Sequence, residues 1–236
     1  MTAGIESVWP LFGLRIRTER LVLRLPTESD LIALISVAKA GIHPDGEMPF
    51  GVAWSTAPSP AFERRFLQHH WGMWAHWAPE AWGLNLMVEL DGMPIGSQSI
   101  HARDFAVFRT VDTGSWLGQA YQRRGFGTEM RAAVLTLAFD RLGAQVAESS
   151  ALLDSAASSR VSRKLGYEEN GRGSLAPEGV ARETQRFRMT AEAWRSRPRP
   201  PVTIEGLDAC RACVTCNLRR RRRPRPAIRA RCLHPT

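Results

Sequence analysis

A glycine-containing segment in the middle of the chain has the residue types and spacing needed to bind an anion. It consists of Gln122, Arg123, Arg124, Gly125, Phe126, Gly127 and Thr128. It follows an alternating segment, 110–117, typical of a β-strand, and it opens an amphipathic segment typical of a helix. Glycines keep side chains out of a loop, and a helix N-terminus supplies unpaired N–H donors and the positive end of a dipole. The segment therefore predicts a seat for a pyrophosphate, while the same residues also fit a tight strand-to-helix turn without a ligand.

A second segment, rich in hydroxyl groups, begins about 30 residues further on and covers 154–167. Its serines include Ser155, Ser158 and Ser162. A serine hydroxyl can donate a hydrogen bond to a ligand, but serines at the start of a helix also serve simply as N-caps. An amphipathic helix over about 127–141 and an apolar strand over 145–152 are expected between the two segments.

The elements that position these segments are expected to be strands with helices interspersed. Residues 20–25 alternate with a period of two, which is typical of a strand, and Thr27 with Asp30 three residues later is typical of a helix start. The further strands are expected over 84–90, 94–102, 110–117, 145–152 and 181–189, and the further helices from Ser59 and over 127–141 and 158–165. A long loop rich in Gly and Pro is expected over 41–57. This order predicts an α+β fold around one mostly antiparallel sheet, and the periodicity stops after about Trp194.

Charge and composition exclude several classes of protein. The chain of 236 residues has a net charge of +9, but eight arginines and no acid lie in 218–236, so the remainder is near +1. A basic nucleic-acid-binding body is therefore not expected. No early segment has the apolar run of a signal peptide, and no run is long enough to span a membrane. All four cysteines lie in the last 27 residues, which argues against a disulfide-stapled secreted domain and favours a cytoplasmic protein.

The two segments together resemble the GNAT acyl-CoA N-acyltransferases, and more narrowly their RimJ/RimL-like branch. The resemblance rests on Gln122-x-x-Gly125-x-Gly127 followed by 154–167, and it covers about residues 14–194. Three shorter segments, 9–12, 48–50 and 112–117, are similar to a mycobacterial-type subgroup that has been linked to succinyl-CoA. The resemblance implies a mixed, mostly antiparallel sheet with a splayed central pair of parallel strands, flanked by helices. It also implies acetyl-CoA or succinyl-CoA as co-substrate, with no metal.

The resemblance implies which residues bind the coenzyme. The pantetheine arm is expected along the edge of the strand at Ser115, Trp116 and Leu117, and it is expected to contact Ser155, which stands where the family usually has an asparagine. The pyrophosphate is expected on the backbone N–H groups of 124–128, with charge added by Arg123 and Arg124.

The catalytic residues are likewise implied by the resemblance. Asp112 lies on the strand expected to bind pantetheine, where the family often has an acid that acts as a base through water; it also fits an aspartate paired with a neighbouring arginine. Ser158 is the first choice to assist the departing sulfur and Ser162 the second. A backbone N–H near Trp116 or Leu117 is the candidate for the oxyanion. For a succinyl carboxylate the candidates are His43, His101, Arg103 and Arg109, each of which also fits an ordinary surface residue.

The domain boundary is expected at residue 196, followed by a low-complexity, Arg- and Cys-rich extension over 197–236 that is expected to be disordered. Cys210, Cys213 and Cys216 resemble a metal-binding run, but the usual fourth ligand three residues later is absent. The arginine block can hold nucleic acid only nonspecifically. The expected partner is an amine acceptor, either a protein or a small molecule; the subgroup suggests a homodimer, without support from composition. The alternative to an enzyme is a non-catalytic acyl-CoA-binding sensor.

Overall fold

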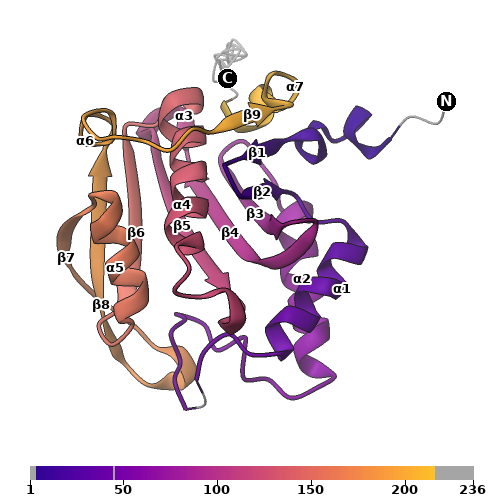
Figure 1. Ribbon diagram of the computed structural model, residues 1–236, viewed down its shortest axis with the longest axis vertical. Coiled ribbons are helices and arrows are strands. Elements are labelled where there is room, and N and C mark those ends of the chain that lie inside the picture. Colours follow the sequence, from indigo (N-terminus) through magenta and orange to yellow (C-terminus); the bar gives the residue numbers. More distant parts are fainter. Residues whose placement is uncertain (1–3, 45, 216–236) are drawn as a thin grey trace, which may run out of the picture.

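The computed structural model describes residues 4–44 and 46–215. Across this described part, nine strands form one sheet in the order β7-β8-β6-β5-β4-β3-β2-β1-β9 (Figure 1). The strands are β1 (Arg15–Arg17), β2 (Leu21–Arg24), β3 (Ala81–Leu90), β4 (Met93–Arg103), β5 (Thr110–Leu117), β6 (Val146–Leu152), β7 (Glu168–Leu175), β8 (Arg182–Thr190) and β9 (Thr203–Glu205). The helices are α1 (Glu28–Lys39), α2 (Ala61–Ala75), α3 (Phe105–Phe108), α4 (Phe126–Thr136), α5 (Ala156–Leu165), α6 (Ala191–Arg195) and α7 (Leu207–Thr215). The predicted α+β class with a mixed, mostly antiparallel sheet is confirmed.

A parallel pair of strands interrupts the antiparallel order near the centre of the sheet. β5 and β6 are paired at Thr110↔Val146, Val111↔Ala147 and Asp112↔Glu148, and there the pairing ends. From Thr113 to Leu117 β5 remains paired with β4 on its other side. The edge of β5 that faces β6 is therefore unpaired within the described chain, and the two strands diverge as the resemblance implies.

Helices cover both faces of the sheet. The alternation of side chains along β3 shows which helices pack on each face. Leu84, Leu86 and Val88 of β3 belong to the main core together with the apolar residues of α4. Met87, which points to the opposite face, belongs to a second core formed with α1 and α2. Figure 1 shows α4 and α5 side by side over β5 and β6, and α1 and α2 together at the other end of the sheet.

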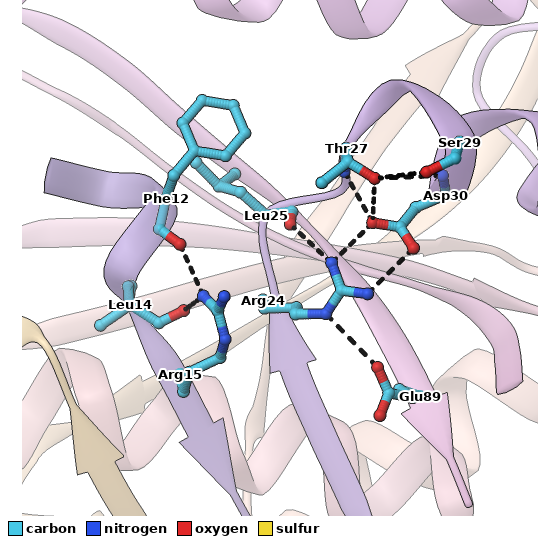
Figure 2. A network of polar contacts seen from close by, with 9 residues as sticks. All are labelled: Phe12, Leu14, Arg15, Arg24, Leu25, Thr27, Ser29, Asp30 and Glu89. Atoms are coloured by element: carbon cyan, nitrogen blue, oxygen red, sulfur yellow. Dashed lines mark hydrogen bonds and ion pairs between the residues drawn. The ribbon is translucent and has the colours of Figure 1, made fainter. Parts of the chain in front are cut away.

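A network of charged and polar groups fixes the start of α1 (Figure 2). Arg24 at the end of β2 donates to both carboxylate oxygens of Asp30, at 2.6 and 2.9 Å, and to Glu89 of β3 at 3.3 Å. Asp30 also accepts from the backbone N–H of Thr27 at 2.7 Å, and the Thr27 hydroxyl accepts from the N–H of Asp30, which completes a capping box. Burial alone would raise the pKa of Asp30, but the hydrogen bonds from Arg24 and Thr27 outweigh it and hold this pKa at about 2.

We expect Asp30→Asn to lower the free energy of unfolding by about 2 kcal/mol at neutral pH, because the ion pair with Arg24 is lost and the return bond of the capping box to the N–H of Thr27 is weakened. The folded-state pKa lies below its ordinary value of 3.8, so this contribution is complete above about pH 5 and is lost as the pH falls through about 2. Urea unfolding of the variant and the parent at several pH values measures the difference. Glu28→Gln, an exposed change of the same charge in the same helical turn, is the control. A loss that does not depend on pH would contradict the assignment to this carboxylate.

The ordered body extends past the boundary that the sequence predicted at residue 196. β9 pairs with β1 through Ile16↔Ile204 and becomes the edge of the sheet. Leu207, Cys210 and Val214 of α7 are buried in the main core. The expectation of disorder from residue 197 is therefore wrong for 197–215, because this segment has its own strand partner and apolar face. Cys216 and the arginine block lie outside the described residues.

Candidate active site

The glycine loop forms the start of α4 as predicted. Gly125 is the residue before the helix and has a left-handed backbone with φ of +87°, which glycine adopts without strain. Among the described residues, the backbone N–H groups of Arg124, Gly125, Phe126 and Gly127 donate to no other residue. The N–H of Thr128 instead donates to the carbonyl oxygen of Gly125 at 3.1 Å. Four N–H groups of the predicted seat are thus available to an anion, and the fifth is occupied in the first turn of the helix.

The side chains around this loop have distinct roles. Arg123 and Arg124 are exposed beside the seat, whereas Phe126 is buried beneath it. Glu129 fixes Arg20 next to the loop by accepting from its guanidinium at 2.5 and 2.8 Å. Gln122 braces the loop, because its amide donates to the carbonyl oxygens of Leu117 at 2.9 Å and Ile42 at 2.6 Å. The structure therefore assigns the amide of Gln122 a supporting contact within the protein.

Asp112 lies at the last paired position before β5 and β6 diverge. Its side chain points to the face opposite α4, and its register partner on β4 is His101. Although the side chain reaches solvent, the surrounding protein desolvates it, and this burial together with the charge of Glu148 raises the pKa of Asp112 to about 6, against a smaller opposing effect of Arg131. Burial, and then the neighbouring His69, lower the pKa of His101. The arrangement places a carboxylate and a neutral imidazole side by side at the closed end of the gap.

The three candidate serines of the second segment lie at different depths. Ser155 precedes α5, and Ser158 is in its first turn; both are half-buried, and neither side chain has a hydrogen-bond partner among the described residues. Ser162 is fully buried and accepts from Arg131 of α4 at 3.0 Å. Ser115 of β5 accepts from the same guanidinium at 3.2 Å. The fold thus brings Ser115 and Ser162 together beside the gap, while Ser158 lies nearer the surface.

Arg131 is the residue of this site that the sequence did not single out. It is 3 % exposed and, besides Ser115 and Ser162, donates to Ser149 of β6 at 3.4 Å. In the sequence it is a lone charge inside the apolar run 130–135, which is the signal that would have identified it. Its guanidinium spans the gap because it bonds residues of both diverging strands.

The residues considered for a succinyl carboxylate lie in different parts of the structure. His43 is held in the 41–57 loop by Ser55 at 2.8 Å and by the carbonyl of Pro44 at 3.0 Å. Arg109 precedes β5 at its closed end, where it donates to the carbonyl of Leu142, and Arg103 is exposed at the end of β4. Of the four, His101 is the one that lies beside Asp112.

The 41–57 loop borders the face of the sheet that carries Asp112. Trp54 of the loop contacts Trp116 of β5, with ring centroids 5.7 Å apart, and stacks on Phe62 of α2 at 6.1 Å. Arg182 of β8 donates to the carbonyl of Met48 at 2.9 Å and forms an ion pair with Asp154. The loop is therefore anchored on both sides of the gap, to α2 and β5 on one side and to β8 on the other.

Neither a metal site nor a membrane-spanning helix is found in the part of the chain that the structure describes. Within 4–44 and 46–215, no group of three or more His, Cys, Asp or Glu side chains is arranged to hold a metal ion. No helix in the same part of the chain has the length and apolar character needed to cross a membrane.

Comparison with known proteins matches this arrangement to one family. The sequence profile described as the acetyltransferase (GNAT) domain matches residues 20–168. Mycobacterium smegmatis RimJ, solved in complex with CoA-disulfide, is similar over 85 % of this chain and 91 % of its own, with 20 % identity and a TM-score of 0.61. A GNAT-family acetyltransferase from Bacillus anthracis is similar over 75 % of this chain and 99 % of its own, with 17 % identity and a TM-score of 0.60. A ribosomal-protein-S5-alanine acetyltransferase from Vibrio fischeri is similar over 78 % and 99 %, with 17 % identity and a TM-score of 0.56. The glycine loop, the diverging strands and the profile match together show that this chain belongs to the GNAT acetyltransferase family.

Proposed function

We propose that this protein transfers an acetyl or succinyl group from acyl-CoA to a primary amine by direct attack of the amine on the thioester. The observation that carries the proposal is the junction of four unpaired backbone N–H groups at the start of α4 with the unpaired edge of β5. The first can hold a pyrophosphate and the second can hydrogen-bond an extended amide chain such as pantetheine. A ligand that uses both has its acyl end in the gap between β5 and β6.

In the proposed reaction Asp112 removes the proton of the attacking amine. At pH 7 only about one lysine-like amine in 2,500 is neutral, since its pKa is about 10.4. A base that holds the proton, directly or through one water molecule, relieves this cost of about 4–5 kcal/mol. Asp112, with its pKa raised to about 6, is ionised at neutral pH and still basic enough to share a proton. A backbone N–H near Trp116 or Leu117 is proposed to stabilise the oxyanion.

The amine is proposed to approach on the face that carries Asp112, along the anchored 41–57 loop. Aromatic side chains from the loop, α2 and β5 border this approach, among them Trp54, Phe66 and Trp116. The reaction is possible with a protein N-terminus, a lysine side chain or a small amine as acceptor, and an amine panel distinguishes the three.

The proposal is tested by measuring CoA release from acetyl-CoA and from succinyl-CoA in parallel, with and without amines. A peptide with a free N-terminus, a lysine-containing peptide blocked at its N-terminus and a small amine form the panel. We expect amine-dependent release with at least one donor, and mass spectrometry of acyl-CoA retained by protein from its native host identifies the donor. Tight acyl-CoA binding without release across the panel would instead support the non-catalytic sensor.

A further inference from the structure

A buried positive charge without a counter-ion lies next to the proposed thioester site. Arg131 is 3 % exposed, and within the described chain no salt bridge joins it to a carboxylate. Its Nε atom is buried without a partner. Burial lowers the pKa of its guanidinium, against smaller opposing effects of Tyr167 and Asp112. Burial raises the pKa of Tyr167, so its phenol is neutral at pH 7, and the side chain of Asp112 points to the other face of the sheet. Burying an unpaired cation is strongly unfavourable for folding, so its presence here points to an anion that arrives with the substrate.

The hydroxyl groups around Arg131 also leave hydrogen-bond donors for an anion. The guanidinium is a donor only, so Ser115 and Ser162 use an oxygen lone pair to accept from it. The hydroxyl of Ser149 donates a hydrogen bond to the carbonyl oxygen of Thr113 at 3.4 Å. In contrast, no acceptor among the described residues takes the hydroxyl hydrogen of Ser115 or of Ser162. Two O–H donors and a cation therefore converge beside the gap without an acceptor.

The position of Arg131 relative to the gap between β5 and β6 indicates which anion it would contact. Ser149 follows the last paired residue of β6, and Ser115 lies three residues past the last paired residue of β5. A guanidinium bonded to both lies across the opening on the α4 face, where Figure 1 shows α4 and α5 over β5 and β6. Two atoms of an acyl-CoA at this depth become negative during the reaction, the carbonyl oxygen and the thioester sulfur. The proposed partner of the oxyanion is a backbone N–H near Trp116 or Leu117, which leaves the sulfur as the anion for Arg131.

We propose that Arg131 is the positioning residue for the leaving thiolate: it aims the hydroxyl hydrogens of Ser162 and Ser115 at the sulfur and stabilises the charge that forms there. The inference rests on the proposed function. The amine nitrogen forms the new bond to the carbonyl carbon, and its proton passes to Asp112 through water. The C–S bond then breaks, its electron pair stays on sulfur, and CoA leaves after the thiolate takes a proton from solvent. No oxidant or further reactant is needed.

The test is the pKa of the thiol of CoA bound to the protein, followed by ultraviolet absorbance of the thiolate. The complex with S-methyl-CoA, which has no ionisable thiol, and the ligand-free protein are the blanks. In the wild type we expect the bound thiol to titrate about 1–3 pH units below free CoA, as a cation within a few ångströms produces. Arg131→Met should return the thiol to its ordinary range, and Arg131→Lys should retain part of the shift. Ser162→Ala should also lose part of it.

A purely structural role for Arg131 predicts a different set of results. If the cation is retained for function, Arg131→Met should unfold at the same temperature or higher, because an unpaired buried charge is removed. Its kcat should fall about 10²–10³-fold, as on loss of one aimed donor group. A wild-type thiol with an ordinary pKa would overturn the inference, whether or not the variants fold. So would a variant that loses only succinyl transfer while the thiol pKa stays unchanged, since the anion would then be a carboxylate. Calorimetry of CoA binding keeps the two proposals separate, because absence of binding counts against the proposed function itself.

Discussion

Gly125→Glu is expected to abolish binding of acyl-CoA. Position 125 has φ of +87°, which a residue with a side chain adopts only with strain, and an added Cβ meets Arg20 at 3.3 Å. More importantly, a carboxylate there lies among the N–H groups proposed to hold the pyrophosphate. Repulsion between like charges in such a seat costs several kcal/mol, so we expect affinity for CoA to fall about 100-fold or more. Isothermal titration calorimetry with CoA measures the loss.

Gly125→Asn is the matched control for this variant. Asparagine accepts a left-handed backbone better than other residues with a side chain and carries no charge. We expect its affinity to lie between those of the wild type and the glutamate variant, which separates the effect of bulk from that of charge. Unaltered affinity of Gly125→Glu would show that the nucleotide binds elsewhere and would remove the basis of the proposed function.

Asp112→Asn is expected to lower kcat about 10²–10⁴-fold, the usual contribution of a general base, without changing the affinity for CoA. In the wild type the base must be ionised, so kcat should rise as the pH passes upward through about 6 and then level off. The pH–rate profile of Asp112→Asn should lack this rise, which is the acidic limb of the wild-type profile. Because Asp112 is destabilised in its charged form by burial, removing the charge should leave the thermal midpoint unchanged or raise it.

Two neighbouring substitutions make the assignment specific. Glu148 raises the pKa of Asp112, so Glu148→Gln should shift the acidic limb to lower pH while the maximal rate is kept. His101→Gln should leave the limb in place. If the limb instead survives in Asp112→Asn and disappears in His101→Gln, the base is the histidine that faces Asp112 on β4.

The parts of the fold that could be predicted are those with a local signal. The strand and helix around the glycine loop were predicted because Gly125 and the alternation of 110–117 encode them locally. β7 was missed because its residues, 168–175, are polar and almost all exposed, so it lacks the alternation of a half-buried strand and exists through its pairing with β8. β9 has three residues and pairs with a strand about 190 positions earlier, which no local pattern can reveal.

In the candidate site, too, the positions of residues could be predicted from local sequence but their surroundings could not. The positions of Ser155, Ser158 and Ser162 at the start and in the middle of one helix follow from the sequence, but their environments do not. Ser162 differs from the other two because it accepts a hydrogen bond from the guanidinium of Arg131 in α4. Arg131 in turn donates to side chains from β5, β6 and α5. A single charge in an apolar helix gives no indication of partners that come from three other elements. The role of each residue stays a prediction until the variants are measured.

The pairing of β9 with β1 has a consequence for biosynthesis. Translation proceeds at roughly 5–20 residues per second, so about 10–40 s separate the emergence of Arg17 from that of Glu205. Throughout this interval the nascent polypeptide exposes the outer hydrogen-bonding groups of β1, and such an open edge is a site for aggregation with neighbouring chains. A chain shortened before Thr203 would therefore keep the outer border of β1 uncovered, and we expect it to aggregate more readily than the full chain.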